Sequence, residues 1–81
     1  MDRANTNFLK VDIATALTFS GIALQADDPI KKNRNRRNAR KGYDTIVRLV
    51  DKVHLSKDDA QVIREGLRRL KSELERLGEV F

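Results

Sequence analysis

Residues 56–81, SKDDAQVIREGLRRLKSELERLGEVF, contain the clearest structural pattern in the chain. Their apolar side chains recur at alternating spacings of three and four residues, which is typical of a helix that packs against other helices. This seam consists of Ala60, Ile63, Leu67, Leu70, Leu74, Leu77 and Phe81. Ser56 and Asp59 are placed as a capping box with Asp instead of Glu, and Gly78 stands where a helix C′ residue is expected. The stretch therefore predicts a helix over residues 57–77.

The segment before this helix has a matching seam. It consists of Ala39, Tyr43, Ile46, Val50 and Val53. A short connection around His54 and Leu55 separates the two segments, so they are expected to form an antiparallel hairpin. The triplet Asp27-Asp28-Pro29 is a helix start signal, because a carboxylate cap is followed by proline at the first helical position. We therefore expect a second helix over residues 29–53.

The first helical segment, residues 7–26, is apolar nearly all round, because only Lys10 and Asp12 are charged. Such a helix is normally buried. One interpretation is that it lies deep in the groove of a three-helix bundle. The other is that one of its faces packs against a second copy of the chain. We expect a dimer, since a small core benefits most from a partner. The predicted interface consists of Ile13, Leu17, Gly21 and Leu24.

Together these segments predict an all-α protein, an antiparallel three-helix bundle with helices at about 7–26, 29–53 and 57–77. Its 81 residues correspond to a single small helical domain, residues 1–81. The chain has no cysteine, which excludes a disulfide scaffold, a cysteine-ligated zinc and an iron–sulfur cluster. Oligomerisation is therefore the expected additional source of stability for a domain with so small a core.

Positive charge is concentrated in one short stretch. The chain has 17 basic and 12 acidic residues, and residues 31–41, KKNRNRRNARK, contain seven of the basic ones and no acid. Clustered arginine and lysine side chains suit contacts with phosphates, and the composition resembles arginine-rich segments that fold as helices on structured RNA. The candidate anion-binding or nucleic-acid-binding residues are Lys31, Lys32, Arg34, Arg36, Arg37, Arg40 and Lys41. At 100° per residue, one stripe of the helix contains Arg34, Arg37, Lys41, Arg48 and Lys52.

The same charges also have an ordinary structural interpretation. Soluble helices carry charge opposite their apolar seam, and the hairpin is expected to bring Glu73, Glu75 and Glu79 alongside the start of the second helix. However, cations near a helix N-terminus oppose its macrodipole by about a few tenths of a kcal/mol each when exposed. The stability of the helix alone therefore does not explain the concentration of positive charge in residues 31–41.

The sequence predicts a non-catalytic protein with no cofactor, no metal and no small-molecule substrate. Asp51, His54 and Ser56 lie close together, but Ser56 is better explained as a helix cap. We expect a small helical interaction or assembly module. The alternative is a nucleic-acid-binding module that contacts phosphates through residues 31–41. A peripheral membrane role is third, because the basic stripe is expected to have charged or amide neighbours instead of an adjoining apolar face.

The expected location is the cytoplasm. The longest uncharged run, residues 13–26, has 14 residues, fewer than the roughly 20 of a membrane span. Asp2 and Asp12 reduce the positive charge of a would-be signal peptide, and Leu24 occupies a position where its cleavage site needs a small residue.

Overall fold

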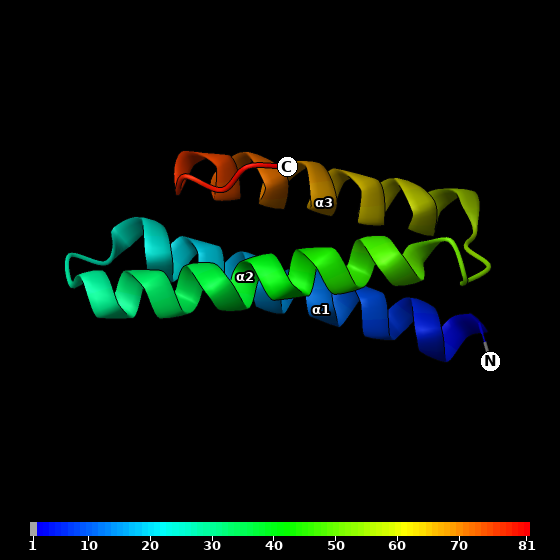
Figure 1. Cartoon of the computed structure of the whole chain (residues 1–81). Coiled ribbons are helices and arrows are strands. Elements are labelled where there is room, and N and C mark those ends of the chain that lie inside the picture. Colours follow the sequence, from blue (N-terminus) through cyan, green and yellow to red (C-terminus); the bar gives the residue numbers. More distant parts are fainter. Residues whose placement is uncertain (1) are drawn as a thin grey trace.

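Three antiparallel helices form the structure, a computed structural model that describes residues 2–81, with side chains from Thr6 onward. They are α1, Asp2–Gln25; α2, Pro29–Val50; and α3, Lys57–Arg76. Figure 1 shows α1 and α3 running in the same direction, with α2 antiparallel to both. No strand occurs among the described residues. The predicted all-α three-helix bundle is therefore confirmed.

The ends of two helices differ from the predicted boundaries. Helix α1 begins at Asp2, five residues before the predicted start, and α2 ends at Val50, three residues before the predicted end. After Val50 the chain turns, with the N–H of Lys52 donating to the carbonyl of Leu49 at 2.9 Å. Val53 still packs against the core from this connection. The apolar period therefore continues past the point where the helix stops.

Both ends of α3 are capped as the sequence predicts. The Ser56 hydroxyl oxygen accepts a hydrogen bond from the N–H of Asp59 at 3.1 Å. At the other end Gly78 has a φ of +94°, and the N–H of Glu79 donates to the carbonyl of Leu74 at 3.0 Å. This is a Schellman motif, which reverses the chain at a glycine in the left-handed region. Residues 79–81 consequently run back along the bundle (Figure 1).

The core consists of two clusters along the bundle. The first contains Leu9, Ile13, Ile46 and Ile63, and the second contains Ala16, Ala39, Leu70 and Leu74. Both clusters combine residues of all three helices. Ile46 lies with Ile63, and Ala39 with Leu70, which is the register expected for an antiparallel hairpin of α2 and α3.

Two glycines allow α1 to approach its neighbours closely. A Cβ atom added at Gly42 of α2 would lie 3.1 Å from the Cβ of Ala16. One added at Gly66 of α3 would lie 2.5 Å from the Cγ2 of Ile13, which is closer than real Cβ contacts. Helix α1 packs against both other helices more extensively than they pack against each other. The absence of side chains at these two positions thus seats α1 in the groove between α2 and α3.

The segment Thr6–Gln25 of α1 is long and apolar enough to cross a membrane by length and composition alone. This result differs from the expectation based on the uncharged run, because a span tolerates Lys10 and Asp12. The core helix of a soluble protein, which is mostly buried, and an N-terminal signal sequence meet the same criteria, and 28% of this segment is buried. The packing of α1 against α2 and α3 accounts for the apolar composition of its inner side.

Candidate binding surfaces

The residues predicted to form a dimer interface lie mainly on the inner side of α1. Ile13 is 6% exposed and belongs to the first core cluster, and Leu17 packs against both clusters. Gly21 and Leu24 are half-buried. Ile13 and Leu17 therefore stabilise the single chain, and the exposed side of α1 is formed by other residues.

The solvent side of α1 carries an apolar seam of its own. Phe8, Val11 and Ile22 are 56%, 62% and 36% exposed. Thr15 and Thr18 lie between them and are also exposed. These five residues follow one another at spacings of three, four, three and four, which is the a/d pattern of a helix that packs against a facing helix. We call Phe8, Val11, Thr15, Thr18 and Ile22 the outer seam.

No ionisable group lies on the outer seam, although 36% of the chain is charged. Only Lys10 and Asp12 are charged between residues 7 and 26, and both point to neighbouring helices. Lys10 forms an ion pair with Asp59 of α3, with 2.5 Å between Nζ and Oδ1. Asp12 lines the shallow groove between α1 and α2 together with Lys41. A solvent-facing helix surface this free of charge is unusual for a soluble bundle.

Gly21 differs from the other glycines of the chain. A Cβ atom added there would meet no heavy atom within 4 Å, and the residue has ordinary helical geometry. Glycine inside a helix costs about 1 kcal/mol relative to alanine. Close packing explains Gly42 and Gly66, and the positive φ explains Gly78. Nothing inside the described chain requires glycine at position 21.

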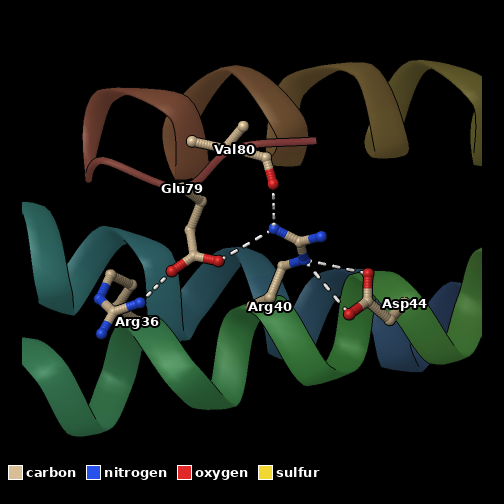
Figure 2. A network of polar contacts seen from close by, with 5 residues as sticks. All are labelled: Arg36, Arg40, Asp44, Glu79 and Val80. Atoms are coloured by element: carbon tan, nitrogen blue, oxygen red, sulfur yellow. Dashed lines mark hydrogen bonds and ion pairs between the residues drawn. The ribbon is translucent and has the colours of Figure 1, made fainter.

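Two arginines of the basic segment are neutralised within the protein. Figure 2 shows Glu79, carried back by the chain reversal after α3, accepting hydrogen bonds from both Arg36 and Arg40. The Nη1 atom of Arg40 lies 3.0 Å from Oε1 of Glu79 and 2.9 Å from the carbonyl oxygen of Val80. Its Nε atom lies 3.0 Å from Oδ1 of Asp44. The hydrogen bond and charge of Asp44, followed by those of Glu79, raise the pKa of Arg40 above its ordinary value.

Aromatic contacts reinforce this arrangement. The guanidinium carbon of Arg40 lies 4.1 Å from the ring centroid of Phe81. Tyr43 meets the same ring edge-on with centroids 4.9 Å apart, and Nζ of Lys71 lies 5.4 Å from its centroid. Cation–π and edge-to-face contacts of this kind are favourable. Arg36 and Arg40 therefore have a structural role, holding the segment after α3 against α2.

Glu79 is the only one of the three predicted glutamates that pairs with the basic segment. Glu73 instead accepts hydrogen bonds from the hydroxyl of Ser20, which is fully buried, and from Nε of Arg69 at 3.3 Å. No ion pair involving Glu75 is found among the described side chains. The structural interpretation of residues 31–41 is thus supported for two of its seven cations.

The other five cations of the segment have no acidic partner within 4.0 Å among side chains from Thr6 onward. They are Lys31, Lys32, Arg34, Arg37 and Lys41. Three of these, together with Arg48, are exposed along the solvent side of α2. We call Arg34, Arg37, Lys41 and Arg48 the basic stripe. Lys52 was expected to extend it but lies in the turn after α2.

Across the part of the chain with described side chains, no three His, Asp or Glu residues are grouped to hold a metal ion. His54 is exposed in the connection between α2 and α3, where Ser56 caps α3. The candidate sites are therefore two surfaces, the outer seam and the basic stripe. No protein-family profile matches the chain, and the searches of curated proteins and of solved structures found no match.

Proposed function

We propose that this protein is a small non-catalytic helical assembly module that pairs with a second copy of itself through the outer seam. The observation that supports this proposal is an exposed a/d seam without any ionisable group. The dimer is the one expected from the sequence, but its interface lies on the side of α1 opposite to Ile13 and Leu17. We also propose that the protein is cytoplasmic.

A second copy suits the outer seam for electrostatic and geometric reasons. In a two-fold dimer the same patch meets itself, so a charged patch would bring like charges together. The outer seam avoids this repulsion, and pairing it removes Phe8, Val11 and Ile22 from water. Ala14 and Gly21 lie beside the seam and are small, so they allow a facing helix to approach closely.

An antiparallel pairing of two α1 helices uses the seam evenly. Centred between Thr15 and Thr18, it places Val11 opposite Ile22 of the second copy at both ends of the contact. The threonines then meet at the centre, where threonine pairs can form hydrogen bonds. A domain of this size buries only about 60–65% of its unfolded surface, so the added burial contributes appreciably to its stability.

Analytical ultracentrifugation tests the proposal. The wild-type chain is expected to sediment with twice its mass of 9.3 kDa and to dissociate on dilution. Val11→Lys and Ile22→Lys, made separately, are expected to be folded monomers, because both side chains are exposed in the single chain. Circular dichroism verifies that the helices remain.

Val47→Lys is the matched control. Val47 is 43% exposed and projects about 140° away from Gly42, the residue of α2 that faces α1. It adds the same charge and should leave the dimer unchanged. A wild-type chain that remains monomeric at high concentration, or equal dissociation by all three variants, would show that the outer seam does not pair.

A further inference from the structure

The excess positive charge of the protein belongs to one part of the fold. Residues 1–50 contain ten basic and five acidic residues, whereas residues 57–81 contain six of each. The net charge of +5 is therefore carried by the first two helices and the connection between them. Within this part, residues 31–41 on the first half of α2 contain seven cations and no acid. A field of one sign on one helix attracts polyanions.

The fold neutralises this charge only in part. Glu79 binds Arg36 and Arg40, which lie toward α3. The basic stripe, Arg34, Arg37, Lys41 and Arg48, lies toward solvent and forms no ion pair within 4.0 Å among the described side chains. The exposed Asp44 lies close to the stripe but pairs with Arg40. The four cations of the stripe therefore remain available to an external anion.

Helix stability does not account for the cations at the start of the basic segment. The first turn of α2 contains no acidic residue and carries Lys31 at a position where the helix macrodipole disfavours positive charge. The N-cap Asp28, which accepts a hydrogen bond from the N–H of Ile30 at 3.1 Å, and the preceding Asp27 offset this effect only in part. A requirement outside the fold explains such a segment better than folding does.

We propose that the basic stripe binds the sugar–phosphate backbone of a nucleic acid. From Arg34 to Arg48 the stripe extends about 21 Å along a helix, with neighbouring cations about 4.5, 6 and 10.5 Å apart along its axis. Long basic side chains at this spacing reach several phosphates of one strand, and each arginine can hold a phosphate through two parallel hydrogen bonds. The inference does not depend on self-association, because the outer seam lies on a different helix.

Two amide side chains of α2 beside the stripe suit a nucleic acid. Asn33 and Asn38 are exposed on either side of it, and their amides can donate to and accept from sugars and base edges. A helix that binds a membrane surface instead carries a broad apolar face next to its cations. On α2 the exposed apolar residue in line with the stripe is Ile30, at its first turn. The outer seam of α1 adjoins the stripe across a shallow groove lined by Thr15 and Lys41, so the test also measures binding to lipid vesicles.

The number of phosphate contacts sets the expected salt dependence. Four contacts with duplex DNA give a slope of about −3.6 in a plot of log K against log salt concentration. Binding should then weaken by about 150-fold between roughly 50 and 200 mM KCl. Near physiological salt the Kd should lie at about 1–100 µM, as for binding without sequence preference.

Fluorescence anisotropy of the full chain with a labelled RNA hairpin and a labelled DNA duplex measures both quantities. The test variant carries Arg34→Gln, Arg37→Gln and Lys41→Gln, which remove three charges without lowering helix propensity. The matched control carries Lys57→Gln, Arg64→Gln and Arg76→Gln, three exposed cations of α3 without ion pairs among the described side chains. Both variants have the same net charge.

The test variant is expected to lose at least about tenfold in affinity, and its slope should fall to about −0.9, the value for one contact. The control should keep the wild-type slope. The proposal is supported if the test variant loses affinity for either nucleic acid while the control keeps the wild-type slope. The nucleic acid with the lower Kd is then identified as the ligand. The proposal is overturned by equal losses in both variants or by the absence of binding near physiological salt. It is equally overturned if the chain binds vesicles of phosphatidylserine and phosphatidylcholine but neither nucleic acid.

Discussion

Gly66 of α3 lies directly against the side chain of Ile13 of α1. A Cβ atom at position 66 would lie 2.5 Å from Cγ2 of Ile13, which is itself 6% exposed and held within the first core cluster. Helix α3 can therefore approach α1 this closely only while residue 66 has no side chain. The contact locks α1 into the groove of the hairpin formed by α2 and α3.

Gly66→Ala is expected to destabilise the protein despite alanine's better helix propensity. Overpacking of a core costs about 1–3 kcal/mol, and replacing a helical glycine returns about 1 kcal/mol. We expect a net loss of up to about 2 kcal/mol in the free energy of unfolding, measured by urea denaturation. A higher free energy of unfolding would mean that the two helices do not meet at this position.

Gly21→Ala is expected to have the opposite effect. No atom of the described chain lies within 4 Å of the added methyl group, so the methyl group causes no clash. The better helix propensity of alanine should therefore raise the free energy of unfolding by up to about 1 kcal/mol. The measurement is made in the Val11→Lys background, which separates folding from association. A loss of stability in that background would show that Gly21 has a close neighbour within the chain.

Ser20→Ala is expected to weaken the contact between α1 and α3. The Ser20 side chain is fully buried and its hydroxyl donates to the carboxylate of Glu73. Removing a hydrogen bond to a charged group costs about 1.5–3 kcal/mol. Ser72→Ala, at an exposed position of α3, should change stability by no more than about 0.5 kcal/mol. Urea denaturation of the two variants should therefore give clearly different midpoints.

The ion pair between Lys10 and Asp59 predicts a loss of stability in acid. The hydrogen bond from Lys10, followed by that with Ser56, lowers the pKa of Asp59 below its ordinary value of 3.8. Because the pKa is lower in the folded chain, this stabilisation is complete above about pH 3.8 and is lost as the pH falls through the folded value. Asp59→Asn should remove this part of the acid dependence.

Urea denaturation at a series of pH values measures this dependence. Asp51→Asn is the control, since Asp51 is exposed and makes no ion pair among the described side chains. It should keep the wild-type dependence on pH. An Asp59→Asn variant as sensitive to acid as the wild type would place the responsible carboxylate elsewhere.

Glu79→Gln is expected to lower the stability of the fold and to increase the number of phosphate contacts with nucleic acid. The change leaves Arg36 and Arg40 without their shared carboxylate, which should cost about 1–2 kcal/mol for a partly buried pair. Arg36 then becomes available to phosphates, whereas Arg40 still pairs with Asp44, so the salt slope for duplex DNA should steepen by up to about 0.9. Anisotropy titrations measure this slope. A slope equal to that of the wild type would indicate that Arg36 remains held against α3.

The three helices could be predicted from the sequence because their signals are local. The proline after Asp28, the cap at Ser56 and the glycine after Leu77 each act within one turn of their own helix. The seams of α2 and α3 also identify the sides of these two helices that face the core. The end of α2 was placed three residues too late, since Val53 continues the apolar period from the connection that follows.

The tertiary structure alone decided which surfaces remain available for binding. Helix α1 is apolar on two sides, so its sequence pattern does not select the buried one. The close approaches at Gly42 and Gly66 select it, because they admit the side of α1 that carries Ala16 and Ile13. Tertiary structure also decides which cations of the basic segment are paired and which are exposed. Pairing of Arg36 and Arg40 depends on the chain reversal that carries Glu79 back across the bundle, a contact between residues about forty positions apart that no local pattern encodes.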